Sequence, residues 1–203
     1  MSSRKERERA KRQEVLLEAA GLVFGRKPFD EATMQDVATA AEISIQGLYE
    51  FFPSKQEMYE QVMLYYAGVF HDHAQAALAE APESPIERLN VLARVYVKHF
   101  QEVPFTLPMF VRDRVQFDFG FDTRFRRHYQ EVYETERHRV TSLLQEAVAC
   151  GALRSLDPEF LTQLVMDVLQ ASLHFAYHRS PREEVGPCVA RAMECLLHGI
   201  GTE

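Results

Sequence analysis

The sequence has few cysteines, no long apolar run and no leader-like start. Its three cysteines, Cys150, Cys188 and Cys195, form no CxxC spacing, so neither a disulfide framework nor a structural zinc site is expected. This cysteine usage is typical of the reducing cytoplasm. No stretch approaches the roughly 18 uninterrupted apolar residues of a membrane span, so no membrane partner is expected. The opening MSSRKERERAKR lacks an apolar segment and is not expected to be a secretory signal.

Motifs of the common enzyme classes are also missing. The chain has no GxGxxG, no P-loop and no GxSxG, which mark nucleotide sites and activated serines. It has no HExxH, and no glutamate precedes a histidine by three residues, which disfavours a di-iron bundle. We therefore expect no catalytic residue, no cofactor and no metal ligand. His174 and His178, one helical turn apart, are a pair that a metal could share, but satisfied or interfacial histidines are the simpler interpretation.

Charge is unevenly distributed along the chain. The net charge is −7, yet residues 1–55 hold nine basic and nine acidic residues, so the remainder carries the whole excess. In the first dozen residues the basic side chains outnumber the acidic ones, and they are Arg4, Lys5, Arg7, Arg9, Lys11 and Arg12. Such a basic end favours contact with phosphates, and a solvated charged helix is the alternative.

Helical periodicity extends over the whole chain, and no hairpin signal or period-two alternation predicts a strand. The first amphipathic helix is expected over about residues 5–25, ended by Pro28. The later helices of the first half are expected at 34–40 after a Thr33 cap, from Ser44 to about Phe51, from the Ser54–Glu57 capping box to about Ala79, and between Pro85 and Pro104. Three more are expected at about 123–149, from Asp157-Pro158 to about His178, and after Pro181 to near Gly199. The sequence therefore predicts an all-α fold.

Two short helices joined by a turn of three or four residues need a third helix to bury a core, and the first helix supplies it. This is the geometry of a helix-turn-helix, whose second helix enters the major groove of DNA. The residues suited to the inner faces are Val37, Ala38, Ile43, Leu48 and Phe52. The residues that point outward are Ser44, Ile45, Gln46, Gly47, Tyr49 and Glu50.

The stretch EVLLEAAGLVF, followed by ATMQDVATAAEISIQGLYEFFPSKQEMYEQV, resembles the DNA-binding segment of the TetR family of regulators. The resemblance covers about Arg12–Val62. It implies a three-helix DNA-binding domain with the helix-turn-helix at residues 1–55. It also implies a larger helical ligand-binding and dimerisation domain at residues 56–203. A cytoplasmic homodimer on a palindromic double-stranded DNA operator is the assembly that it implies.

Four residues are expected to hold the DNA backbone. Thr33, Ser44 and Lys55 lie at helix N-termini, where hydroxyls and free N–H groups favour a phosphate. The resemblance adds Tyr49 as a phosphate contact. Such contacts position a protein on DNA and carry little sequence information.

Three residues of the second short helix are expected to face the bases. The amide of Gln46 can pair with adenine, and Ile45 can press on a thymine methyl group. Gly47 removes a side chain where the helix backbone approaches the groove. For each of these DNA-binding residues taken singly, a plain cap or an exposed side chain is the alternative.

Several positions depart from the family pattern, among them Glu42, Phe51, the Lys27-Pro28-Phe29 turn and Glu50. Glu42 stands where a glycine is usual in the turn between the two helices, and a left-handed backbone there would cost roughly 1 kcal/mol. Phe51 replaces a usual histidine or tyrosine, so one phosphate contact is expected to be absent. These departures leave the fold expectation intact and bear on operator preference.

The segment 96–140 is unusually aromatic, with polar side chains interleaved. An apolar cavity with a few polar anchors is what a small-molecule site needs. The expected ligand-binding residues are Tyr96, His99, Phe100, Phe110, Arg114, Phe117, Tyr133 and Arg137. The expected effector is apolar or aromatic, with an acidic group held by an arginine, and a plain aromatic core is the alternative.

By the same resemblance, the last two helices form the dimer seam. The expected seam residues are Leu164, Val168, Ala171, Phe175, Val189, Met193 and Leu196. Intrachain core is the alternative for some of them. The function expected overall is a transcriptional regulator, a repressor released from its operator by a small ligand, and not an enzyme. The runner-up is a ligand-binding helical protein whose DNA head is degenerate or unused.

Overall fold

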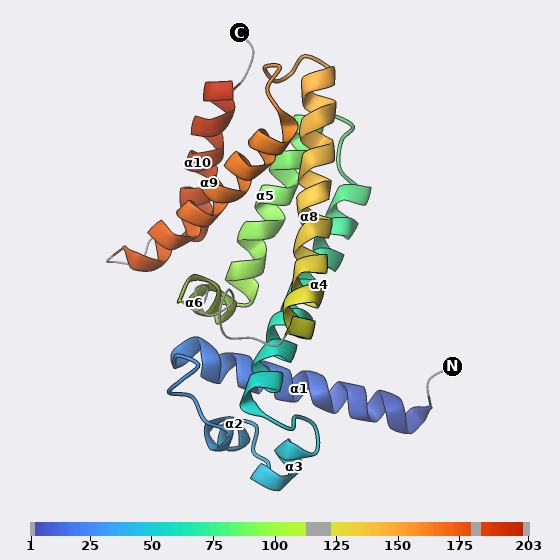
Figure 1. Cartoon of the computed structure of the whole chain (residues 1–203), viewed down its shortest axis with the longest axis vertical. Helices are drawn as coiled ribbons and strands as arrows, with labels where there is room; N and C mark the ends of the chain where they lie inside the picture. Colours follow the sequence, from blue (N-terminus) through green and yellow to red (C-terminus); the bar gives the residue numbers. More distant parts are fainter. Residues whose placement is uncertain (1–2, 113–122, 180–183, 201–203) are drawn as a thin grey trace. The chain divides into compact units, whose positions relative to one another are not determined.

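The computed structural model describes residues 3–112, 123–179 and 184–200 (Figure 1). Within these ranges every regular element is an α-helix, which confirms the predicted fold class. No helix within the described ranges has an apolar stretch of the length that a membrane span requires. The chain forms two compact units, which we call the head (Met1–Ala67 with Pro104–Arg126) and the body (Gly68–Val103 with Arg127–Glu203). The functional boundary between residues 55 and 56 is a different division and stays a prediction.

Helix starts in the head are set by local caps. Helix α1 (Arg4–Arg26) begins after Ser3, whose Oγ accepts the Glu6 N–H while the Glu6 carboxylate accepts the Ser3 N–H. Helices α2 (Met34–Ala40) and α3 (Ile45–Tyr49) follow, each after a predicted cap. Helix α4 (Lys55–Ala79) starts after Ser54, whose Oγ accepts the Glu57 N–H at 3.1 Å. Helix α6 is Thr106–Arg112.

Helix α3 is shorter than its predicted extent to about Phe51. It ends at Tyr49 with Glu50 as the C-cap. The Phe51 N–H bonds to the Leu48 carbonyl, three residues back, at 3.0 Å, so the chain closes into a tighter turn there. Pro53 then prevents the helix from continuing.

The core of the head is built from the predicted inner faces. Val37, Ala38, Leu48 and Phe52 are buried, whereas Ile43 is half-buried. Aromatic rings form part of this core, since the ring of Phe24 on α1 meets Tyr59 on α4 edge to face, with centroids 4.9 Å apart. Phe29 packs on the same tyrosine at 5.2 Å. Edge-to-face pairs of this kind add to the burial of apolar area that holds α1 against the start of α4.

The turn between α2 and α3 contains the expected left-handed residue. Glu42 has φ 53, a backbone conformation that favours glycine. The turn is closed by the Ile43 N–H, which bonds to the Ala38 carbonyl at 3.0 Å. The departure from the family's glycine is therefore accommodated with backbone strain rather than by a different turn.

Helix α6 packs against α1 within the head. A Cβ built on Gly21 would lie 2.3 Å from the ring of Phe105, and one on Gly25 would lie 2.5 Å from the Phe105 Cβ. Because neither glycine has a side chain, Phe105 can pack directly on the backbone of α1 at these two positions. Arg112 at the end of α6 donates to the carbonyl oxygens of Phe24 at 2.6 Å and Lys27 at 3.1 Å, which satisfies the C-terminus of α1.

The body is a bundle of longer helices. Beyond the second half of α4 they are α5 (Pro85–Glu102), α8 (Thr123–Ala149), α9 (Pro158–His178) and α10 (Val185–Ile200). Asp157 caps α9, with proline at the first helical position as predicted. Helix α10 packs against α9 and α5 (Figure 1). The buried core side chains include Leu89, Leu92, Leu143, Leu144, Leu161, Val165 and Leu173.

Candidate DNA-binding head and effector site

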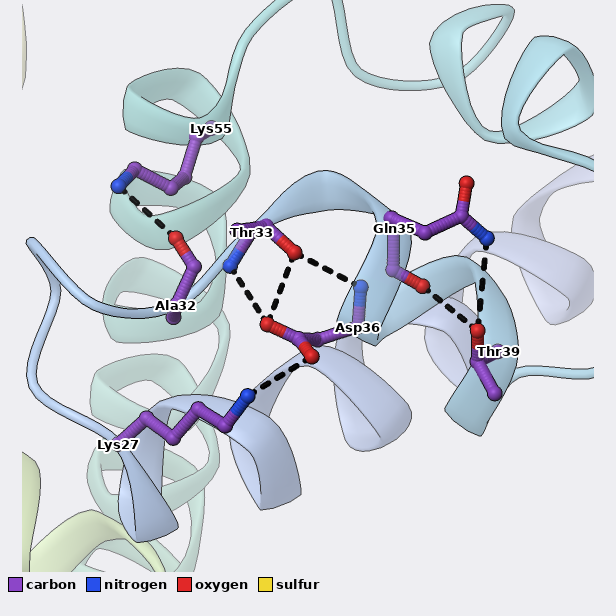
Figure 2. A network of polar contacts seen from close by, with 7 residues as sticks. All are labelled: Lys27, Ala32, Thr33, Gln35, Asp36, Thr39 and Lys55. Atoms are coloured by element: carbon purple, nitrogen blue, oxygen red, sulfur yellow. Dashed lines mark hydrogen bonds and ion pairs between the residues drawn. The ribbon is translucent and has the colours of Figure 1, made fainter.

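The start of α2 is held by a polar network (Figure 2). Thr33 Oγ1 accepts the Asp36 N–H at 3.1 Å and donates to Asp36 Oδ2 at 2.8 Å, while the Thr33 N–H donates to the same oxygen at 2.9 Å. The Lys27 ammonium donates to Asp36 Oδ1 at 2.8 Å. Lys27 first, and then Thr33, lower the pKa of Asp36 to about 2. Thr33 is exposed, so this network fixes its backbone and hydroxyl at the surface.

Lys55 is less available than the sequence indicates. Its Nζ donates to the carbonyl oxygens of Phe29 at 2.7 Å and Ala32 at 2.9 Å, and lies 4.5 Å from the Phe29 ring centroid (the Ala32 contact is drawn in Figure 2). An ammonium has three donors, so one remains for a phosphate. In the structure, Lys55 ties the start of α4 to the loop before α2. Its phosphate contact stays a prediction.

The outward face of α3 carries the other predicted DNA contacts. Ser44 and Gln46 are exposed, Ile45 is half-buried, and Tyr49 is 46% exposed. Ser44 Oγ accepts the Gly47 N–H at 3.1 Å, which caps the helix. A Cβ on Gly47 would lie 3.2 Å from that Oγ, so glycine also relieves crowding at the cap. The geometry brings these residues together on one short helix.

In the body, three of the predicted ligand residues cluster on α5. The His99 ring packs edge to face on Phe70 of α4 at 5.6 Å and on Phe100 at 5.4 Å, and Tyr96 contacts Phe70 at 6.1 Å. His99 is only 7% exposed, and its Nδ1 has no hydrogen-bond partner among the described residues. Burial is the main cause that lowers the pKa of His99 to about 4, so the imidazole is neutral at pH 7.

The remaining predicted ligand residues are not gathered in this cluster. Phe110 lies on α6, in the head. Tyr133 and Arg137 lie on α8, where Arg137 forms ion pairs with Glu159 and with Glu134. The hydrogen bond to Glu159 raises the pKa of Arg137. A carboxylate from the chain itself thus occupies the guanidinium that was expected to hold an acidic ligand group. The last two predicted ligand residues, Arg114 and Phe117, lie outside the described residues.

The predicted dimer residues divide between surface and core. On α9, Phe175 is 49% exposed, Ala171 is exposed, and Leu164 and Val168 are half-buried. On α10, Val189, Met193 and Leu196 are buried within the chain. For these three the structure gives the intrachain packing that was the alternative, and the seam itself stays a prediction.

The histidine pair shows no further metal ligand. The rings of His174 and His178 lie 4.3 Å apart on the exposed side of α9. Among the described residues, no group of three or more potential ligands is present. The three cysteines are free thiols.

Two contacts were not predicted from the sequence. Arg112 caps the C-terminus of α1 from a distance of 88 residues along the chain. Phe51, seen in the sequence only as a lost phosphate contact, has the guanidinium groups of Arg9 and Arg12 near its ring. Neither contact has a local sequence signal, because each joins segments that only the tertiary fold brings together.

Comparison with known proteins finds a family that is similar to the head. The family of bacterial regulatory proteins called tetR matches residues 16–62, from the middle of α1 into α4. The transcriptional repressor KstR2 of Mycolicibacterium smegmatis is 28% identical over 186 residues, which cover 87% of this chain and 86% of that protein.

Two solved structures are similar over almost their whole length. The fatty acid degradation regulator FadR from Bacillus halodurans has a TM-score of 0.80 at 18% identity, covering 93% of this chain and 95% of that one. The regulator FadR from Bacillus subtilis, in complex with stearoyl-CoA, has a TM-score of 0.74 at 15% identity, covering 92% and 98%. The matched segment contains the whole helix-turn-helix. The matched segment of this chain is therefore similar to the tetR family of bacterial regulatory proteins, and the relative that covers most of the chain's length is a transcriptional repressor.

Proposed function

We propose that the chain is a cytoplasmic repressor that binds a palindromic operator as a homodimer and leaves it when an apolar small molecule enters the body. One head would read each half-site, and the two recognition helices would lie about 34 Å apart or a multiple of that. The relative from Mycolicibacterium smegmatis is a repressor by name, which supports this direction of control.

On the DNA side, the proposal rests on the exposed residues of α2 and α3. Thr33, Ser44 and Tyr49 would hold phosphates, with Lys55 adding its remaining donor. Gln46 would pair with a base edge, and Ile45 would contact a thymine methyl group. The caps that fix Thr33 and Ser44 support the proposal, because they hold the hydroxyls at the surface before DNA arrives.

The observation that carries the effector site is the Nδ1 of His99, which has no hydrogen-bond partner in the part of the chain that the structure describes. A buried polar nitrogen without a partner costs about 1–3 kcal/mol, which a ligand would recover by making the missing hydrogen bond. The rings of Phe70, Tyr96 and Phe100 around it offer apolar contact. His99 is the polar anchor of the proposed site.

The charge state of His99 limits the chemistry of the effector. A neutral imidazole offers one donor and one acceptor and does not attract a carboxylate by charge. Arg137, the predicted acid anchor, already pairs with Glu159. The group placed at His99 is therefore proposed to be a neutral carbonyl, hydroxyl or amide on an apolar chain or ring. A thioester carbonyl has this chemistry, and the regulator from Bacillus subtilis was solved with stearoyl-CoA.

A ligand shifts an equilibrium only if it binds one conformation better than the other. Helix α4 contributes Lys55–Ala67 to the head and continues into the body, so it offers a direct connection. We propose that effector binding beside Phe70 favours a position of α4 that is incompatible with operator spacing. To weaken operator binding tenfold, the effector must prefer that conformation by about 1.4 kcal/mol.

Dimerisation is proposed to use the exposed apolar side of α9. Phe175 and Phe160 are 49% and 57% exposed there, and large exposed apolar side chains mark interaction surfaces when they gather. Val189, Met193 and Leu196 would support this surface from within the chain.

A ligand panel tests the proposal. Thermal unfolding is measured with acyl-CoA thioesters of different chain lengths, free fatty acids, sterols and aromatic acids. The wild type should be stabilised by a neutral-headed or thioester class, which should also release bound DNA. His99→Phe should need at least tenfold more ligand for the same stabilisation. His138→Gln, at an exposed position of α8, should respond like the wild type. If no class stabilises the protein, or if His99→Phe responds like the wild type, the effector site is elsewhere or absent.

A further inference from the structure

Helix α1 begins well before the segment that matches the family. The match starts at residue 16, whereas the capping box at Ser3 starts the helix at Arg4. The three preceding turns are therefore folded helix and carry six of the nine basic residues of the segment 1–55. Figure 1 shows this half of α1 projecting past α2 and α3. A rigid helix can present charges at fixed positions, which a frayed arm cannot do.

Two arginines of this first part of α1, Arg9 and Arg12, lie near the end of α3. Arg9, Arg12 and Leu16 follow the i, i+3, i+7 spacing of one helix face, and Leu16 is buried in the head. The Cζ of Arg9 lies 4.9 Å from the centroid of the Phe51 ring, and the Cζ of Arg12 lies 5.9 Å from it. These distances are within the range of cation–π attraction.

A hydrogen bond fixes Arg9 further. Its Nη2 donates to the carbonyl oxygen of Glu50, the C-cap of α3, at 3.2 Å. A guanidinium has five N–H donors, so this one hydrogen bond uses only a part of the donor capacity of Arg9. Both arginines are exposed, and within the described ranges neither has a carboxylate at ion-pair distance. The acidic residues one turn before Arg9 and Arg12 on α1 are engaged elsewhere, because Glu8 pairs with Arg4 and Glu6 caps the helix.

We propose that Phe51 is a positioning residue for DNA binding, whose ring holds Arg9 and Arg12 beside α3 so that both contact phosphates flanking the bases that α3 reads. The family's histidine or tyrosine at this position would offer a hydroxyl or an imidazole, whereas phenylalanine offers only a ring face. In this chain the ring recruits two arginines from α1 in place of one polar group. The inference rests on the DNA-binding function and adds a residue and an element to it.

The test uses a duplex selected from a random-sequence pool by the wild-type protein. Its dissociation constant is measured by fluorescence anisotropy at several salt concentrations. Phe51→Leu keeps the apolar volume and removes the ring face. It should weaken binding about fivefold to tenfold and reduce the slope of log Kd against log salt by about one to two per head. Phe51→Tyr keeps a ring for the two arginines and adds a hydroxyl that can donate to a phosphate, so it should bind at least as tightly as the wild type, with no loss of salt slope.

A double-mutant cycle separates positioning from packing. Arg9→Gln/Arg12→Gln should reproduce the loss, and adding Phe51→Leu to it should weaken binding little further, because the ring acts through those arginines. Arg94→Gln/Lys98→Gln removes the same charge from the body and should leave the slope unchanged.

An unchanged salt slope in Phe51→Leu, or losses that add in the cycle, would overturn the proposal. If Phe51→Leu does not fold by circular dichroism, the exposed arginine pair still decides, because wild-type affinity in Arg9→Gln/Arg12→Gln contradicts it. Failure of the wild type to enrich any duplex would instead contradict DNA binding itself.

Discussion

The head satisfies the polar groups of its helix starts at the surface, whereas the described part of the body leaves three buried side-chain nitrogens without a hydrogen-bond partner, Arg88 Nε, His99 Nδ1 and Arg139 Nη1. In the head, Thr33, Asp36 and Lys27 bond to one another at the start of α2, and Ser44 caps α3. In the body, His99 is buried among aromatic rings with its Nδ1 unpartnered. The head therefore presents ordered polar groups at its surface, whereas the body holds an unsatisfied nitrogen among buried rings.

This difference corresponds to the two kinds of partner. DNA meets a surface that is already ordered, so little conformational entropy is lost on binding. An effector that supplies the missing hydrogen bond to His99 stabilises the liganded body selectively, as a switch requires. Changes in the head should therefore act on stability and DNA affinity, and changes at His99 on the response to ligand and pH.

The largest effect is expected in the packed core of the head. Phe24 is fully buried, and its ring meets Tyr59. Phe24→Ala should lower the free energy of unfolding by about 3–5 kcal/mol, measured by urea denaturation. Leu22→Ala, on an exposed part of the same helix, should cost much less, about 0.5 kcal/mol. Equal losses at the two positions would show that α1 is not held by this aromatic core.

The next effect concerns the buried histidine. Because the folded pKa of His99 is about 4 and the unfolded value about 6.5, the unfolded state binds the proton first as pH falls. The free energy of unfolding should therefore decrease from pH 6.5 to pH 4 by up to about 3 kcal/mol from this group. His99→Phe should lose that part of the pH dependence, and His138→Gln should retain it. Identical pH profiles for His99→Phe and the wild type would contradict the buried neutral imidazole.

A smaller effect is expected where α6 rests on α1. Gly25→Ala places a Cβ against the Phe105 backbone, at 2.9 Å from its Cα, so the segment must shift. We expect a loss of about 1–3 kcal/mol. Gly68→Ala is the matched control in α4, because nothing lies within 4 Å of its Cβ position. It should stabilise the protein by about 0.5–1 kcal/mol through helix propensity. Stabilisation by both substitutions would show that α6 is not seated on these glycines.

The smallest effect concerns the turn between α2 and α3. Glu42 has a positive φ, so Glu42→Gly should stabilise the protein by up to about 1 kcal/mol. Glu42→Gln removes the charge, keeps the strain and should be neutral. If the two variants behave alike in thermal unfolding, charge rather than backbone strain governs this position.

The starts of several helices in both units could be predicted because caps are local. Thr33 with Asp36, Ser44, and Asp157 with Pro158 each start a helix at the predicted residue. These signals need no knowledge of the rest of the fold.

Contacts between distant segments could not be predicted in this way. Arg112 bonds to Phe24 across 88 residues, and Arg9 reaches Glu50 across 41. Lys55 shows the same limit, since its helical position was predicted but the carbonyl partners of its ammonium were not. Apolar stripes were ambiguous too, because periodicity finds a buried face without saying which chain covers it. Met193 is such a case, buried by its own chain.

The central claim is that two heads bind one operator and that a ligand bound in the body releases both heads from the DNA. Sedimentation of the protein with a duplex selected from a random pool measures it directly. The account predicts two chains per duplex, an enriched site with two inverted half-sites, and free duplex after a stabilising ligand from the panel is added. A monomer at micromolar concentration that enriches no duplex, or a complex that every stabilising ligand leaves intact, would contradict it.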